Sequence, residues 1–490
     1  MSSDAKAASV YIASRSCAMV LNLATLVCAN HFYSHTGWAF IAAALLIHET
    51  AIALGSLGLP DAVFYFLGRY PERAGATVRQ TSLLLAVAGV PVIAIAMVVG
   101  ATMAAHAPEL HLGEALPWIA LAIALELPTQ PAINQLIAHG SVGVASALYV
   151  GFAALRFVGV LGPALAGWPM QAIPIAISLL ATTRLVAHLV IVARVYPRGG
   201  RWLDRAQLAA IARFAVPSGF ASTVGRLNTQ IDKYVVELVL GTATFAVYTV
   251  AAFELPLLTM IPYAIGAIMQ VRYVRLYASG DVVQLRALWY RNVEKIAALV
   301  VPLALFFIVM APDVIRLVFA DGYEAATAPF QVFTAILLHR VGAYGPILQA
   351  IGRNRMLIVT SALILVTNVA LTVPFAHAFG VIGPALATAL SFVPAWIVTL
   401  WCIGQAFGGG IAIALPWRRY AATLVVGGAT AAVLWLARGG LHWHPGVNLA
   451  LAFAGYGALY LVVARITGVV SGDDLAFLRV RRRARSGLAR

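Results

Sequence analysis

Apolar runs long enough to cross a lipid bilayer dominate this chain and leave few alternatives for its fold. Of its 490 residues, 62% are hydrophobic and 10% are charged, with a mean hydropathy of +0.89, whereas an ordinary soluble domain carries about 25% charged residues. A bilayer crossing takes about 20 apolar residues, so short connections leave room for about fourteen crossings. This pattern predicts an all-α polytopic membrane protein and excludes a large extramembrane domain.

The predicted spans follow one another with short connections. They cover residues 10–31, 37–59, 82–105, 115–138, 145–167, 171–195, 214–240, 243–270, 295–319, 326–351, 357–377, 381–405, 417–437 and 446–465.

Basic residues gather in the loops on one side of these spans. The chain has 33 basic and 18 acidic residues, a balance that in a soluble protein would suggest nucleic-acid binding. The opposite side has Arg438 as its basic loop residue, with Glu109, Glu114, Asp321 and Glu324 among the acids. The basic side holds Lys6, Arg69, Arg73, Arg79, Arg198, Arg201, Arg205, Arg213, Arg272, Arg275, Arg286, Arg291, Lys295, Arg353, Arg355, Arg418, Arg419 and the tail arginines 479–490.

Basic residues in short loops mark the cytoplasmic side. We therefore expect an inner-membrane protein with both termini in the cytoplasm and no nucleic-acid partner. The first span, which starts near Val10, lacks a small-residue cleavage site and is expected to stay as an uncleaved anchor.

A polar segment divides the chain. Residues 196–213 alternate apolar and charged side chains, which is typical of a helix lying at the membrane interface. We expect an N-terminal lobe of six spans at 1–195, this interfacial linker helix, and a second six-span lobe at 214–405. Two additional spans (406–465) and a basic cytoplasmic tail (466–490) follow.

A short internal repeat supports two halves. The sequence GVLGPALA starts at Gly159 and GVIGPALA starts at Gly380, with seven of eight positions identical. A separation of an even number of spans predicts two parallel six-helix lobes related by a pseudo-two-fold axis along the membrane normal.

Ionisable residues inside the predicted spans are the strongest functional signal. A charge at a helix centre costs about 2.5–3.5 kcal/mol on insertion scales. Arg156, Arg184, Arg226 and Arg340 lie too deep for their side chains to reach an interface easily, whereas Arg15 is close enough to one to do so. The deep arginines therefore require acidic partners or a water-filled cavity.

Polar residues extend these positions into helical stripes. Arg226, Gln230 and Lys233 share one helical face, as do Tyr11, Arg15 and Asn22 on the first span. We predict a cationic central cavity that binds an anion, since the guanidinium fork matches phosphate oxygens. The candidate substrate-binding residues are Arg15, Asn22, Arg156, Arg184, Arg226, Gln230, Lys233 and Arg340.

The acids in the spans have two interpretations. They either pair with the arginines to hold helices together, or carry a coupling ion, since a carboxyl group in a low-dielectric cavity is protonated more readily. The candidates are Glu49, with adjacent His48, and Glu126, Asp232 and Glu254.

No enzyme constellation or cofactor motif is evident. Cys17, Cys28 and Cys402 fall in apolar segments without metal-ligand spacing, and His442 with His444 lacks further ligands. We therefore expect a protein that is not an enzyme and holds no cofactor, with transport coupled to H⁺, Na⁺ or the membrane potential.

Several segments resemble the polysaccharide-transport branch, containing Wzx-type flippases, of the multidrug/oligosaccharidyl-lipid/polysaccharide flippase superfamily. They are NTQIDKYVVELVLGTATFAVYTVA at 228–251, LVFADGYEAA at 317–326, ILQAIGRNR at 347–355, FGVIGPALATALSF at 379–392 and LGSLGLPDAVFYFLGRYPE at 54–72. The resemblance implies alternating access between two lobes and a cavity that receives an undecaprenyl-diphosphate-linked oligosaccharide, an O-antigen or exopolysaccharide repeat unit.

Two other functions remain open. A membrane glycosyltransferase or polymerase handles the same lipids but needs a sizeable external loop, and a cation-coupled drug antiporter needs an acidic lumen. The expected partners are the lipid-linked oligosaccharide, membrane lipids and polysaccharide polymerase or assembly proteins, and the protein is expected to be monomeric.

Overall fold

The computed structural model describes residues 3–196, 203–253, 255–440 and 443–470, and every regular element in these ranges is a helix. The chain forms two compact units, residues 1–249 and 250–490. Unit 1 contains α1 (Ser3–Phe32), α2 (His35–Ser56), α3 (Leu59–Arg69), η1 (Pro71–Arg73), α4 (Ala74–His106), η2 (Pro108–Leu110), α5 (Leu112–Glu126), η3 (Leu127–Thr129), α6 (Ala132–Ala138), α7 (Val142–Leu165), α8 (Ala172–Val195), α9 (Arg205–Asn228), α10 (Ile231–Val235) and the π-helical turn η4 (Val236–Leu240).

The helix α11 (Thr242–Ala251) crosses from unit 1 into unit 2. Unit 2 continues with α12 (Pro256–Ala278), α13 (Val282–Val309), α14 (Ala311–Val318), η5 (Glu324–Ala326), α15 (Thr327–Ile336), η6 (Leu337–His339), α16 (Tyr344–Ala350), α17 (Asn354–Phe379), η7 (Gly380–Ile382), α18 (Gly383–Ala406), η8 (Ile411–Ile413), α19 (Trp417–Arg438) and α20 (Pro445–Ile466).

The all-α membrane fold is confirmed. Ten of the described helical segments are long and apolar enough to cross a membrane, and a bent pair across α9 and α10 makes up to eleven. One of the ten contains both α17 and α18, which pack against each other on either side of η7. The remaining predicted spans fall on interrupted helices, such as α15, η6 and α16, because hydropathy averages over breaks in the backbone.

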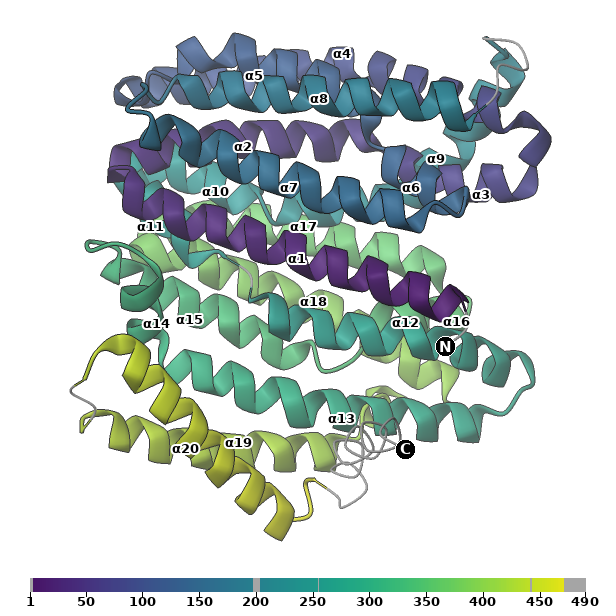
Figure 1. Cartoon of the computed structure of the whole chain (residues 1–490). Helices are drawn as coiled ribbons and strands as arrows, with labels where there is room; N and C mark the ends of the chain where they lie inside the picture. The colour runs from purple at the N-terminus through teal and green to yellow at the C-terminus, as the bar shows by residue number, and fades with distance from the viewer. Residues whose placement is uncertain (1–2, 197–202, 254, 441–442, 471–490) are drawn as a thin grey trace, which may run out of the picture. The chain divides into compact units, whose positions relative to one another are not determined.

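The helix α2 forms the centre of unit 1. Most of its side chains are buried, and it packs against α4, α5 and α9, while α1 packs on α7 and α5 on α8 (Figure 1). Small residues such as Ala42, Ala43 and Ala44 allow close approach of neighbouring helices. Polar residues on α2 therefore face protein and not lipid.

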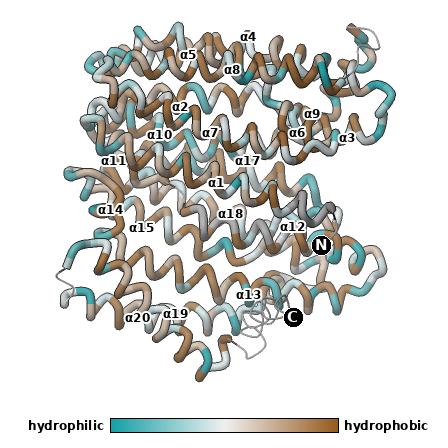
Figure 2. Tube along the Cα trace, in the orientation of Figure 1, coloured by the Kyte–Doolittle hydropathy of each residue, from teal (hydrophilic) through white to brown (hydrophobic). Residues whose placement is uncertain are grey.

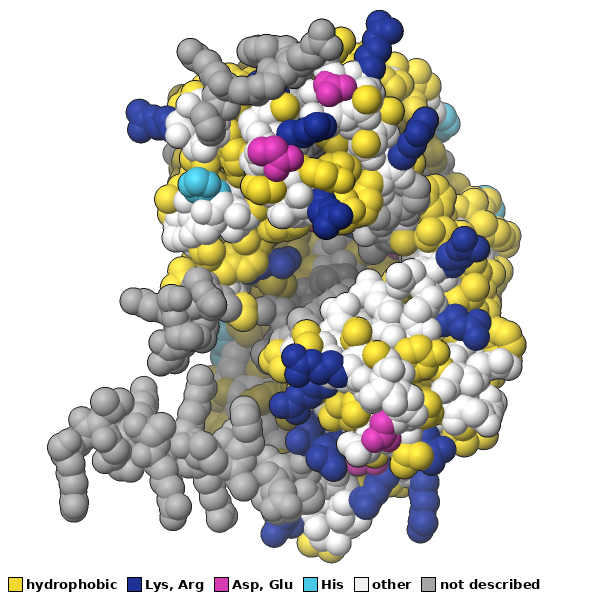
Figure 3. Space-filling view, turned by 90° about the vertical axis from the view of Figure 1, so that its right-hand side faces the viewer, with side chains coloured by type: hydrophobic (Ala, Val, Ile, Leu, Met, Phe, Trp, Pro, Cys, Tyr) yellow, Lys and Arg dark blue, Asp and Glu magenta, His cyan; other side chains and the backbone are white. Residues whose placement is uncertain are grey.

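The outer surfaces match a membrane setting. Figure 2 shows apolar residues along the helices and hydrophilic residues mainly at the helix ends. Val87, Val90 and Val98 of α4 are among the exposed apolar side chains. On the face drawn in Figure 3, Lys and Arg side chains are more frequent than Asp and Glu, and the cytoplasmic location of the basic side stays a prediction.

The predicted interfacial linker at 196–213 differs from the structure. Residues 197–202 lie outside the described part, and residues from Arg205 onward belong to α9, whose first part ends at Val216 and bends by 49° into the segment that starts at Gly219. The first half of α9 thus continues into a second helical segment across a bend, and the interfacial position of the linker stays a prediction. Asp204 caps it, since its Oδ1 accepts from the backbone N–H of Ala206 at 3.0 Å.

The compact units also differ from the predicted lobes. The division lies at residues 249/250 because α9 packs on α2, α3 and α4 and so joins unit 1. The two repeat copies occupy different places: Gly159 lies within α7, towards its end, while Gly380 begins η7, just before α18. The match therefore does not align two equivalent helices, and the duplicated lobes stay a prediction.

A glycine pair sets the packing of α9. Gly58, with φ of +71°, precedes α3, and a Cβ added to Gly219 of α9 would lie 2.2 Å from the Cα of Gly58. Two backbones meet here with no space for a side chain.

We predict that Gly219→Ala lowers the thermal stability of the purified protein, because overpacking of a tight contact costs about 1–3 kcal/mol. Thermal unfolding in detergent measures the effect. The control is Gly225→Ala on the same helix, where nothing lies within 4 Å of an added Cβ; equal melting temperatures for both variants would contradict the prediction.

Candidate functional site

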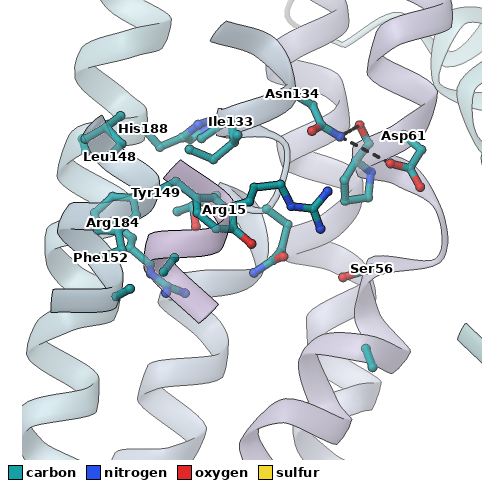
Figure 4. A pocket seen from close by; sticks show the side chains of 18 of the residues that line it. Arg15, Ser56, Asp61, Ile133, Asn134, Leu148, Tyr149, Phe152, Arg184 and His188 are labelled. Atoms are coloured by element: carbon teal, nitrogen blue, oxygen red, sulfur yellow. Dashed lines mark hydrogen bonds between the residues drawn. The ribbon is translucent and has the colours of Figure 1, made fainter. Parts of the chain in front are cut away.

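A polar cavity of about 430 Å³ lies within unit 1. Its walls come from α1, α2, α3, η3, α6, α7, α8 and α9, and Figure 4 shows it from close by. The lining residues include five predicted binding residues: Arg15, Asn22, Arg156, Arg184 and Arg226. On α1, Tyr11, Arg15 and Asn22 all line it, as the helical stripe predicted.

A second cavity of about 310 Å³ shares three arginines with the first, namely Arg156, Arg184 and Arg226. Its lining adds His48, Glu49, Glu126 and Gln230. The smaller cavity therefore brings together predicted site residues from α2, α5, α7, α8 and α9.

Two of the arginines are held by carboxylates. An amino group of Arg156 donates to Oε1 of Glu49 at 2.5 Å, and Arg184 donates to Oε1 of Glu126. Glu126 also lies 3.4 Å from Nε2 of His48 and accepts from Nε2 of Gln130 at 3.2 Å. Glu49 and Glu126 thus take the helix-pairing role that the sequence left open, which leaves their role in ion coupling a prediction.

The other two arginines carry unpaired charge. Arg15 and Arg226 are exposed to the cavity side and form no salt bridge with any residue in the described ranges. Arg15 lies over the ring of Tyr11, with 6.0 Å from its Cζ to the ring centroid. Figure 4 shows Arg15 extending between the side that carries Asp61 and the side that carries Arg184. These two guanidinium groups are available to an anionic ligand.

The stripe predicted from Arg226 to Lys233 is broken in the structure. Because α9 ends at Asn228 and α10 begins at Ile231, the three residues do not share one continuous helix. Gln230 lines the smaller cavity, whereas Lys233 is not among the lining residues of either cavity. The Nζ of Lys233 donates to Oε1 of Gln230 at 2.9 Å.

The remaining predicted residues lie elsewhere. Asp232 is buried and accepts from the Tyr248 hydroxyl at 2.7 Å, which joins α10 to α11. Arg340 belongs to unit 2, where it follows η6 and lies over the ring of Phe392 at 5.5 Å. Glu254 lies outside the described residues.

Sequence reasoning missed three residues that line the larger cavity: Asp61, Tyr149 and His188. His188 lies one helical turn after Arg184, so its position on the same face was a usable signal. Asp61 follows the end of the predicted second span and was assigned to a loop, and nothing in the sequence pattern distinguished Tyr149 from other interfacial tyrosines.

Comparisons with known proteins agree with this architecture. Residues 144–328 match the family described as "Polysaccharide biosynthesis protein". A search of curated protein sequences returned no match. The fold is similar to that of the lipid II flippase MurJ in an inward closed conformation, with a TM-score of 0.75 and 12% identity over 93% of this chain and 98% of that one.

Two further structures share the fold. One is an inward-facing multidrug resistance MATE transporter of the MOP superfamily, with a TM-score of 0.63 and 16% identity over 81% of this chain and 98% of that one. The other is a MOP superfamily transporter from Pyrococcus furiosus, with a TM-score of 0.57 and 15% identity over 81% and 94%. The chain therefore shares the fold of these transporters, and residues 144–328 match the polysaccharide biosynthesis family.

We predict that Glu126→Ala destabilises the protein by about 3–5 kcal/mol, because it strands the Arg184 guanidinium, and that Arg184→Ala in the same chain restores part of the loss. Thermal unfolding of the two single variants and the double variant measures this coupling. Glu114→Ala, an exposed acid of the same helix, is the control and is expected to have little effect. Additive losses in the double variant would show that the pair does not hold the helices together.

Proposed function

We propose that this protein belongs to the flippase superfamily that its sequence resembles, and that it moves an undecaprenyl-diphosphate-linked oligosaccharide from the cytoplasmic to the outer leaflet of the cell inner membrane. The proposal rests on Arg15 and Arg226. Both arginines line a cavity enclosed by membrane-spanning helices, and neither forms a salt bridge with a described residue. Planar guanidinium groups bind phosphate oxygens in a bidentate manner. A diphosphate is the anion that two such groups suit best.

The membrane setting favours a lipid-linked anion over a free one. The cavity walls are helices with apolar outer faces, so a polar head group inside the cavity can remain joined to a prenyl chain in the surrounding lipid. The family description names polysaccharide biosynthesis, and the structural neighbour MurJ is named a lipid II flippase. Both support a sugar-bearing diphosphate lipid, such as an O-antigen or exopolysaccharide repeat unit.

The paired arginines give the cavity a fixed shape. Arg156 and Arg184 are anchored by Glu49 and Glu126, which fixes the positions of these two guanidinium groups in the cavity wall. We propose that H⁺, Na⁺ or the membrane potential drives transport, with Glu49 and Glu126 as the groups through which an ion acts. We further propose that the protein is a monomer with cytoplasmic termini that works beside polymerase or assembly proteins.

We predict that Arg226→Ala and Arg15→Ala each reduce translocation about 10- to 100-fold, the loss that corresponds to one charge-assisted interaction with phosphate. The measurement uses proteoliposomes containing a fluorescent undecaprenyl-diphosphate oligosaccharide and follows its accessibility to a membrane-impermeant quencher. Arg226→Lys should keep part of the activity, because lysine retains the charge without the bidentate fork. Arg340→Ala tests the predicted role of Arg340 in the same assay.

The control is Arg73→Ala, an exposed arginine of η1 outside both cavities. If the wild-type protein leaves the lipid in place but lengthens or transfers its glycan, an enzyme function replaces the proposal. If it moves cationic drugs and not the lipid, the antiporter function replaces it. Collapsing the proton gradient, the sodium gradient or the potential in turn identifies the driving force.

A further inference from the structure

We propose that Asp61, Asn134 and His188 select an uncharged sugar as the residue attached to the diphosphate. The inference rests on the proposed function and adds a substrate class to it. The three side chains come from α3, α6 and α8 and line the same cavity as Arg15 and Arg226.

The carboxylate of Asp61 would be unfavourable in a site that binds only phosphate. Among the described residues that line the larger cavity, it is the one acid. It forms no salt bridge with a described residue, and its closest side-chain partner is Nδ2 of Asn134 at 3.4 Å. A carboxylate repels a phosphate but accepts hydrogen bonds from hydroxyl groups. Its presence beside the arginines indicates a ligand that carries both groups.

Asn134 is oriented for the same purpose. Its Nδ2 donates to the Pro60 carbonyl at 2.8 Å, which fixes the direction of the amide group. No described residue donates to its Oδ1, so this oxygen remains free to accept a second hydroxyl. Figure 4 shows Asn134 and Asp61 together at one side of the cavity.

His188 adds a buried polar atom without a described partner beside the cavity. Its side chain is 2% exposed, and its Nε2 shares a hydrogen bond of 2.9 Å with the Ser82 hydroxyl. Its Nδ1 is buried without a partner in the described part of the chain. An unpaired buried polar atom is unfavourable, and a sugar hydroxyl entering the cavity would supply the partner.

Aromatic side chains complete a sugar-binding surface. Tyr11, Tyr149 and Phe152 line the cavity. Guanidinium groups lie over two of these rings, Arg15 over Tyr11 and Arg184 over Phe152, so Tyr149 is the ring that we propose packs against the C–H face of a pyranose. The cavity volume of about 430 Å³ falls within the range of about 300–1,000 Å³ typical of small-ligand sites. A neutral hexose satisfies the acceptors without adding negative charge next to Asp61, whereas a uronic acid places two carboxylates together.

Binding of three synthetic lipids to the purified full chain tests the inference. The lipids are a prenyl diphosphate, the same lipid with one glucose, and the same lipid with one glucuronic acid. The wild-type protein should bind the glucose lipid at least about tenfold more tightly than the glucuronate lipid, given the repulsion between two carboxylates a few ångströms apart.

Asp61→Asn should remove most of this difference, by weakening binding of the glucose lipid and strengthening that of the glucuronate lipid, while binding of the bare diphosphate lipid does not weaken. Asp61→Glu keeps the charge and should keep the preference, which guards against a simple folding defect. Glu72→Gln, an exposed acid of η1 outside the cavity, is the matched control.

Equal binding of the two sugar lipids by the wild-type protein would overturn the inference and leave the proposed function intact. An equal loss of binding for all three lipids in Asp61→Asn would have the same two consequences. Failure of the wild-type protein to bind any diphosphate lipid would instead overturn the proposed function, and the sugar preference with it.

Discussion

The free energy required to place a charged side chain inside a membrane protein is the constraint on which the structure of unit 1 depends. Each central charge costs about 2.5–3.5 kcal/mol on insertion scales if it faces lipid. Glu49 and His48 lie on α2, the most enclosed helix of the unit. Glu49 pairs with Arg156 of α7, and His48 lies close to the Glu126 carboxylate of α5. The contacts Arg156–Glu49 and Arg184–Glu126 join α7 to α2 and α8 to α5. Ion pairing therefore links α7 to α2, which are not closely packed, and reinforces the packing of α8 on α5. It also sets the polarity of the cavity that these helices surround.

Pairing divides the arginines into two kinds with different uses. A guanidinium already bound to a carboxylate offers less to a ligand, because any phosphate must compete with an attached anion. Arg15 and Arg226 have no such competitor in the described chain, and their greater exposure leaves them hydrated until a ligand arrives. The paired arginines still add positive potential to the cavity, since opposite charges a few ångströms away cancel it incompletely. Binding and wall structure are thus separate functions of the same residue type.

The sequence predicted the fold class and the arginines of the cavity for the same reason. In a membrane, a polar residue within an apolar run has few permitted surroundings, so the sequence alone identifies Arg15, Asn22, Arg156, Arg184 and Arg226.

The errors arose where the backbone departs from a continuous helix. The break between α9 and α10 separates Lys233 from the stripe of Arg226, and periodicity has no means of detecting such a break. The pairing of Glu126 with Arg184 instead of another arginine depends on which helices are adjacent, and that information is absent from any single span. Asp61 was missed because a carboxylate near a span end is usually solvated.

The presence of an acid and an amide beside unpaired arginines limits what the cavity can distinguish. A site built only from cations would bind any phosphate and discriminate by charge alone. Hydrogen-bonding groups that are fixed before the ligand arrives, as Asn134 is by the Pro60 carbonyl, reject ligands that leave them unpaired, and this discrimination is stronger than an apolar pocket achieves. Under the proposed function, a diphosphate shared by the candidate lipids cannot discriminate among them, so specificity must come from contacts beyond it. Asp61, Asn134 and His188 line the same cavity as the arginines, which is why we propose that they recognise the sugar attached to the diphosphate.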